Sequence, residues 1–146
     1  YHKILLWAHE KNIKLYIENN VLSLENYKTF KTNPFFFVKS GEINLFQNLL
    51  SEFNYIFDYA HSFVSSKTLN INEISEFDNF IAETDYIHLS DNNGTSDNNS
   101  SIRPGSSICN HLMRNPPINK TVTLEIYEDI HQIKKVYNWL NNLKSS

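Results

Sequence analysis

The chain has 146 residues and a formal net charge of −3 at pH 7. That length fits a single domain over residues 1–146, and the acidic balance argues against a nucleic-acid partner, because tight DNA binding usually needs a basic face. The one cysteine, Cys109, excludes an internal disulfide and fits a reducing cytoplasm.

Several targeting and binding classes are also excluded. No stretch approaches the ~18 apolar residues of a membrane span, and no signal peptide is recognised. The chain starts at Tyr1 and enters a helical pattern at once, so we expect that upstream material is missing. Only three glycines are present, which rules out a P-loop or a dinucleotide-binding fingerprint.

Helical and strand-like patterns alternate in the first half of the chain. We expect helices over residues 1–11 and 41–51 and strands over residues 13–17 and 54–57, and we leave residues 20–39 unassigned. The second helix would be capped by Ser40 and bury one apolar face. That face carries Ile43, Phe46, Leu49 and Leu50.

The second half continues this alternation, which is typical of a parallel α/β sheet. It predicts helices over residues 70–82, 107–114 and 129–143, strands over residues 85–89 and 121–126, and an exposed polar loop over residues 90–101. Capping boxes are expected at Asn70 with Glu73 and at Asp129 with Gln132. The buried stripes would be Ile74, Phe77 and Ile81, and Ile130, Ile133, Tyr137 and Leu140.

Each predicted strand ends in a side chain that can bind a metal. These residues are Glu18, Asp58, His88 and Glu125. Because the carboxyl ends of parallel strands lie at one edge of a sheet, we expect all four to converge. Three carboxylates and an imidazole suit one divalent metal, among Mn, Zn, Mg, Co and Fe.

Each of these residues also has a plainer interpretation. Glu18 could belong to a solvated turn, Asp58 could cap the next helix, and His88 could be a core histidine. Glu125 is the most informative, because a carboxylate inside an apolar strand is costly unless it is paired or metal-bound. Other histidines are interpreted as surface residues, namely His2, His9, His111 and His131.

The strand ends together resemble the motifs of the xylose-isomerase-like TIM barrels. This superfamily includes sugar-phosphate isomerases and epimerases and the AP endonuclease 2 family. The matching stretches occur in the family's order and read Ile-Glu-Asn at 17–19, Phe-Asp-Tyr-Ala-His at 57–61, His-Leu-Ser-Asp-Asn-Asn-Gly at 88–94, Arg-Pro-Gly at 103–105 and Leu-Glu-Ile at 124–126.

The resemblance implies that the chain is the C-terminal half, strands five to eight, of a (β/α)₈ barrel. Such a half would leave two open sheet edges and an apolar interior face in water. We therefore expect it to pair with a missing N-terminal half or with another copy of itself.

The resemblance also implies a reaction on a sugar or sugar phosphate. One divalent metal would be held by Glu18, Asp58, His88 and Glu125, and the two glutamates would act as acid and base on opposite faces of the substrate. By the same resemblance, the expected substrate-binding residues are His61 and Arg103.

Two alternatives stay open. In the nuclease branch, which binds three zinc ions, an Asp-x-His pair follows the His-Leu-x-Asp segment. The matching stretch here is Asp97-Asn98-Asn99, with asparagine in place of the histidine. The segment that reads Pro-Gly-x-Gly in the family reads Pro104-Gly105-Ser106-Ser107 in this chain. The second alternative is therefore a divergent barrel module without turnover.

Overall fold

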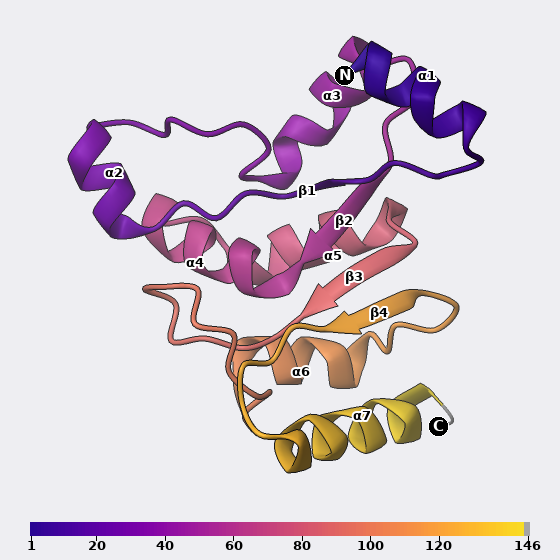
Figure 1. Ribbon diagram of the computed structural model, residues 1–146. Coiled ribbons are helices and arrows are strands. Elements are labelled where there is room, and N and C mark those ends of the chain that lie inside the picture. Colours follow the sequence, from indigo (N-terminus) through magenta and orange to yellow (C-terminus); the bar gives the residue numbers. More distant parts are fainter. Residues whose placement is uncertain (145–146) are drawn as a thin grey trace.

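The computed structural model describes residues 1–144 (Figure 1). In chain order its elements are α1 (His2–Glu10), β1 (Ile17–Glu18), α2 (Leu24–Phe30), the 3₁₀ turn η1 (Ser40–Glu42), α3 (Ile43–Leu49), β2 (Tyr55–Asp58), α4 (Tyr59–Leu69), α5 (Glu73–Glu83), β3 (Tyr86–Leu89), α6 (Ser107–Arg114), β4 (Thr121–Leu124) and α7 (Ile130–Lys144). Within this described part, no helix combines the length and the apolar character needed to cross a membrane.

The four strands form one sheet in the order β1-β2-β3-β4, and every neighbouring pair is parallel. This confirms the predicted α/β class and its parallel strands. The arrows of β2, β3 and β4 in Figure 1 all point toward the side of the molecule where α2 lies. β1 and β4 are the edges of the sheet, and α2 to α6 occupy the crossovers between successive strands, whereas α1 precedes β1 and α7 follows β4.

The core lies between one face of the sheet and the helices. In β3, Ile87 and Leu89 are fully buried, whereas Tyr86 and His88 are half-buried, as the two-residue period of a strand requires. Phe57 of β2 stacks on Phe80 of α5 with ring centroids 5.0 Å apart. Aromatic packing of this kind fixes α5 against the middle of the sheet.

The opposite face of the sheet is mixed, because Ile56 lies beside Tyr86 there among other aromatic and polar side chains. Tyr86 packs edge-on against Tyr16 with ring centroids 5.4 Å apart. Its hydroxyl forms a hydrogen bond of 2.8 Å with Oγ1 of Thr123 on β4. These side chains are half-buried and leave the face partly open to solvent.

The elements differ from prediction in several places. β1 is only two residues long and begins at Ile17, and α2 forms inside the unassigned segment, where Ser23 caps it. The sequence pattern does not indicate α4, because its three serines are buried beside its apolar residues and no clear apolar stripe results. Asn70 ends α4 in the left-handed conformation, while Asn72 caps α5.

Two of the predicted apolar faces are also partly wrong. Leu49 of α3 is 67% exposed, and Ile130 and Tyr137 of α7 are 57% and 58% exposed. α7 instead packs through Val136 and Leu140, which are buried. α7 therefore faces the core a little to one side of its predicted stripe, whereas α3 packs through Ile43 and Phe46 of its predicted face and leaves Leu49 in solvent.

Two polar residues serve roles that the sequence did not indicate. Ser40 lies inside η1 and donates its hydroxyl to Glu76 of α5, instead of capping a helix. His111 of α6 is fully buried rather than at the surface, within hydrogen-bond distance of the Tyr59 hydroxyl at 3.0 Å and of Asp78 Oδ1 at 2.9 Å. The ring of His111 therefore connects α4, α5 and α6.

The packing of Phe57 gives a direct test of the core. Phe57→Ala removes a fully buried ring between β2 and α5, so it should lower the free energy of unfolding by about 3–5 kcal/mol. Phe36→Ala, at a residue that is 77% exposed, should change it by less than about 0.5 kcal/mol. Urea denaturation followed by circular dichroism measures both, and equal effects would contradict the assigned core.

Candidate metal centre

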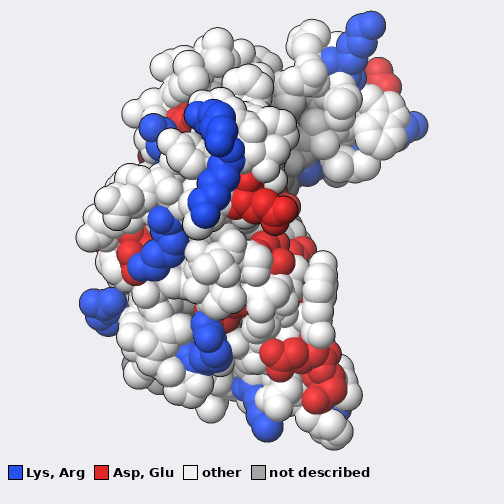
Figure 2. Space-filling model, turned by 90° about the vertical axis from the view of Figure 1, so that its left-hand side faces the viewer, with Lys and Arg blue, Asp and Glu red and all other residues white. Residues whose placement is uncertain are grey.

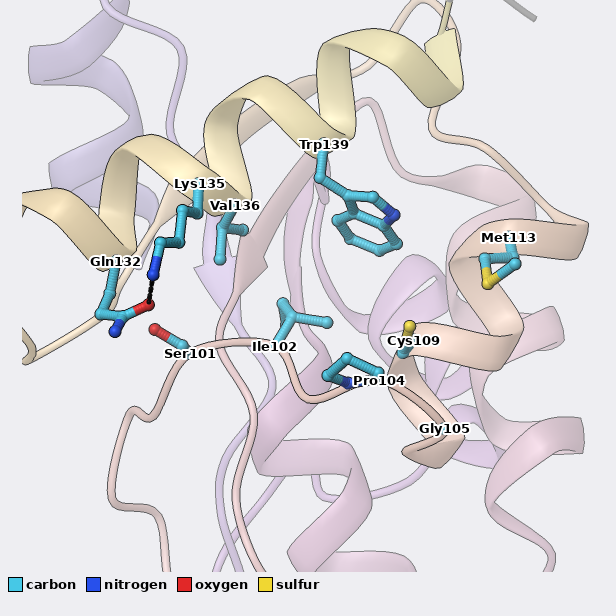
Figure 3. A pocket seen from close by; sticks show the side chains of 10 residues that line it. All are labelled: Ser101, Ile102, Pro104, Gly105, Cys109, Met113, Gln132, Lys135, Val136 and Trp139. Carbon is cyan, nitrogen blue, oxygen red and sulfur yellow. Dashed lines mark hydrogen bonds between the residues drawn. The ribbon is translucent and has the colours of Figure 1, made fainter.

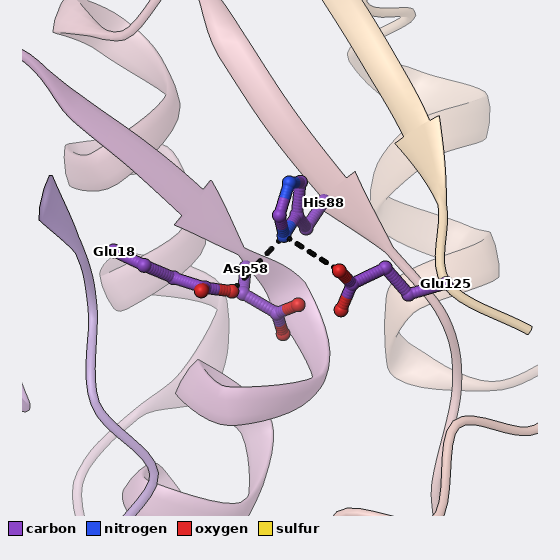
Figure 4. Close-up of side chains that lie close together, drawn as sticks. All are labelled: Glu18, Asp58, His88 and Glu125. Atoms are coloured by element: carbon purple, nitrogen blue, oxygen red, sulfur yellow. Dashed lines mark hydrogen bonds and ion pairs between the residues drawn. The ribbon is translucent and has the colours of Figure 1, made fainter. Parts of the chain in front are cut away.

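The four predicted metal-binding side chains come together at the carboxyl ends of the strands. Glu18 ends β1, Asp58 ends β2, His88 lies near the end of β3, and Glu125 directly follows β4. One candidate ligand atom from each lies within 4.8 Å of all the others. Figure 4 shows the carboxylates of Glu18 and Glu125 approaching His88 from both sides, with Asp58 beside them.

Two carboxylates meet at one imidazole nitrogen. His88 Nδ1 lies 3.0 Å from Glu18 Oε1 and 3.1 Å from Glu125 Oε1. The two glutamates remain about one-third exposed, at 35% and 32% of their side chains. A single N–H can serve both carboxylates only by being shared, whereas a divalent cation would accept a lone pair from each ligand.

Asp58 divides its two carboxylate oxygens between different surroundings. Its Oδ1 accepts a hydrogen bond of 2.7 Å from the backbone N–H of His61, which is a helix cap at the start of α4. Its Oδ2 is buried and has no hydrogen-bond partner among residues 1–144. An unsatisfied buried carboxylate oxygen is costly, so ligation of a cation would stabilise it. Capping and metal binding are therefore compatible, with one oxygen for each.

Burial also changes the acidity of Asp58. It raises the pKa of the carboxyl to about 7, although the nearby charge and N–H of His61 act in the opposite direction. A cation would favour the ionised form of Asp58 because metal binding displaces the proton.

Asn19 holds the ends of β1 and β2 together, a role that the sequence did not indicate. Its side-chain oxygen accepts from the backbone N–H of Asp58 at 2.7 Å, and its side-chain nitrogen donates to the Asp58 carbonyl at 3.1 Å. Asn19 is fully buried. The amide therefore fixes the position of Asp58 relative to Glu18, the residue that precedes Asn19 in the chain.

His61 lies beside the four ligands, with both ring nitrogens engaged. Nδ1 lies 2.8 Å from the carbonyl oxygen of Asn19, and Nε2 lies 3.1 Å from Asp97 Oδ2. Both partners are acceptors, which favours the doubly protonated imidazolium. Burial lowers the pKa of His61, but the hydrogen bond to Asp97 and the charge of Asp58 outweigh it and raise the pKa to about 10.

Neither residue expected to bind substrate is free of protein partners. His61 is engaged as described, and Arg103 directs its guanidinium to the carboxylate of Asp91 and the carbonyl of Asn92. Substrate binding by His61 and Arg103 therefore stays a prediction. The sequence indicates Asp97 only through the nuclease comparison, and no local pattern indicates its contact with His61.

Figure 2 views the molecule from the side toward which the strands point. The right-hand outline is hollowed between two projecting ends, and acidic side chains gather in and around the hollow. A concentration of negative charge in a concave surface attracts cations.

A separate cavity of about 410 Å³ lies between α6, α7 and the segment that leads into α6 (Figure 3). Its lining is mostly apolar and includes Ile102, Cys109, Met113, Val136 and Trp139. None of the four candidate metal ligands lines it, so it is distinct from the candidate metal centre.

Comparison with known proteins supports the fold alone. No protein-family model matches the chain, and neither does any curated protein. A similar solved structure is the TTHB071 protein from Thermus thermophilus, from a crystal soaked with ZnCl₂. The likeness has a TM-score of 0.57 at 19% sequence identity and covers 94% of this chain and 47% of that chain. The chain therefore spans about half the length of this structural relative.

The pKa of Asp58 predicts how cation binding depends on pH. Below about pH 7 the carboxyl is protonated and a cation must displace that proton, so affinity for Mn²⁺ should fall about tenfold per pH unit. Above this point the carboxyl is ionised, and the Asp58 contribution should level off. Calorimetric titration between pH 5.5 and 8.5 measures this, and a constant affinity from pH 5.5 to 7 would contradict it.

Proposed function

We propose that this chain carries the metal centre of a sugar or sugar-phosphate isomerase or epimerase. The observation that carries the proposal is the convergence of four ligand atoms within 4.8 Å at the ends of four parallel strands. The orphaned Oδ2 of Asp58 adds independent support for one divalent cation. Mn, Zn, Mg, Co and Fe all accept this mixture of carboxylate and imidazole ligands.

The cation, when bound, would polarise the carbonyl and hydroxyl oxygens of a substrate as a Lewis acid. Glu18 and Glu125 come from opposite edges of the sheet and remain partly exposed, so a substrate can reach both. One carboxylate would remove the proton next to the substrate carbonyl, and the other would return a proton on the opposite face. Asp58, being buried, would serve only as a ligand.

The structural relative bears on the choice of metal. Its crystal was soaked with ZnCl₂, and zinc accepts histidine and carboxylate ligands in catalytic sites. Zinc therefore belongs beside Mn²⁺ among the first ions to test on this chain.

The nuclease alternative has less support. At the position where that branch carries a second histidine, this chain has Asn99. Its side-chain oxygen accepts a hydrogen bond of 2.9 Å from the Ser90 hydroxyl, away from the His61–Asp97 pair. The acidic net charge also disfavours DNA as a ligand, because tight DNA binding usually needs a basic face.

We also propose that the sheet is one half of a closed (β/α)₈ barrel of the xylose-isomerase-like superfamily. The open edges β1 and β4 support this, as does a structural relative about twice as long. In Figure 1, α1 lies beyond the β1 edge and α7 beyond the β4 edge. If the partner were a second copy, α1 of one copy and α7 of the other would meet at the same junction between the two sheets. We therefore favour as partner a different α/β half that begins and ends with a strand.

Proton transfer by the two glutamates is tested by solvent exchange. With Mn²⁺ in D₂O and a panel of ketoses and ketose phosphates, the chain should exchange the hydrogen next to the substrate carbonyl, as NMR can detect. Glu18→Gln and Glu125→Gln should each slow this exchange by about a hundredfold or more, because each removes a general acid or base.

Glu128→Gln is the matched control, since this nearby carboxylate bonds Ser101 and lies outside the ligand group. It should leave exchange unchanged. Because the isolated half can lack activity when the rest of the pocket is absent, the exchange is also measured with the partner half of the barrel supplied. If a chain that binds one equivalent of metal exchanges no sugar in the panel even then, the isomerase proposal is wrong and the inert-module alternative is favoured.

A further inference from the structure

The loop between β3 and α6 is an ordered structure with a polar interior, although the sequence predicted an exposed loop. Ser90, Asp91, Asn92 and Asn99 are buried. Asp91 and Ser100 exchange two backbone hydrogen bonds of 2.8 Å each, as an isolated antiparallel bridge. These bonds hold the two ends of the loop over residues 91–100 together.

A buried carboxylate, that of Asp91, also holds the two ends of this loop together. Asp91 Oδ2 accepts from the backbone N–H of Arg103 at 3.0 Å and from its Nε at 3.4 Å, and Oδ1 accepts from the backbone N–H of Asn92 at 2.8 Å. The guanidinium of Arg103 also donates to the Asn92 carbonyl. A fully buried charge that loses its partner is strongly destabilising, so the Asp91–Arg103 pair, here called the clasp, constrains both ends of the loop.

The loop is also tied to the beginning of α4. The side-chain nitrogen of Asn92 donates to the Ala60 carbonyl at 2.9 Å, and its oxygen accepts from the backbone N–H of Gly94 at 2.8 Å. Gly94 has φ +79°, and a Cβ there would come within 3.3 Å of Phe63. The loop therefore lies directly against the helix that carries His61.

Asp97 lies on this loop and contacts His61. Its Oδ2 is 3.1 Å from His61 Nε2, while the other ring nitrogen of His61 faces the Asn19 carbonyl at 2.8 Å. Two acceptors from separate segments thus fix the plane of the imidazole. His61 also touches the metal centre, because its backbone N–H bonds Asp58 Oδ1 and its Nδ1 lies 3.8 Å from Glu18 Oε1.

We propose that the Asp91–Arg103 clasp is a positioning device for the metal centre. It presents Asp97 to His61. His61 in turn holds Asp58 through its backbone N–H and faces Glu18 with its imidazole, in the geometry that a cation requires. This assigns Asp91, Arg103 and Asp97 as positioning residues, and it places Arg103 in the protein framework rather than on a substrate. The proposal rests on the proposed function for its effect on metal affinity.

The test compares three variants of the full chain with a control. Asp91→Asn and Arg103→Ala each remove one partner of the clasp. Asp97→Asn removes the loop carboxylate that contacts His61. Asp85→Asn is the control, because this exposed residue precedes β3 and its carboxylate pairs with Lys14 at 2.7 Å, outside the clasp and the ligand group. The readouts are the ring N–H signals of His61 in NMR spectra without metal, and the affinity for Mn²⁺ in calorimetry.

The three variants should lose or shift the His61 Nε2–H signal and bind Mn²⁺ about tenfold more weakly, since loss of a group that orients metal ligands typically has this effect. The control should change neither. If Asp91→Asn does not fold, Arg103→Ala and Asp97→Asn still test whether the clasp positions His61. Variants that melt at lower temperature yet keep the His61 signal and the Mn²⁺ affinity would overturn the proposal. If the unaltered chain binds no Mn²⁺, the metal function fails, while the His61 signal still tests the clasp.

Discussion

The parallel order of the four strands is the constraint on which the rest of the structure depends. Each strand is joined to the next by a crossover, so all four carboxyl ends must lie at the same edge. Glu18, Asp58, His88 and Glu125 are distant in sequence, yet this topology brings their ligand atoms within 4.8 Å. The buried packing of Phe57, Ile87 and their neighbours holds the strands in register and thereby maintains the site.

The arrangement concentrates negative charge in a small volume. Three carboxylates belong to the candidate ligand group, and Asp97 lies close by through its contact with His61. An imidazolium at His61 offsets part of this charge, and its hydrogen bonds direct it to Asn19 and Asp97. Like charges so close together are unfavourable unless one of them binds a proton or a cation lies among them. The buried Oδ2 of Asp58, without a hydrogen-bond partner in the described part of the chain, marks the place where that cation would act.

The sequence predicted the strand ends better than it predicted their surroundings. Glu125 next to a strand and His88 inside one stand out locally, because polar groups in apolar runs are costly unless they have partners. Their neighbours are set by contacts between distant segments, which no local pattern contains. The bonds of Asn19 to the backbone of Asp58 and of Asp97 to His61 span 39 and 36 residues. α4 escaped prediction for a related reason, since its buried serines make its sequence resemble that of a polar segment.

The central claim is that these four strand ends hold one divalent cation, and calorimetric titration with Mn²⁺ and Zn²⁺ tests it most directly. The account predicts binding near one equivalent for the unaltered chain and its loss in a His88→Ala/Glu125→Gln double variant, with both proteins folded by circular dichroism. Absence of binding, or equal binding by the double variant, would contradict the account and leave the four residues as a polar strand edge without a metal.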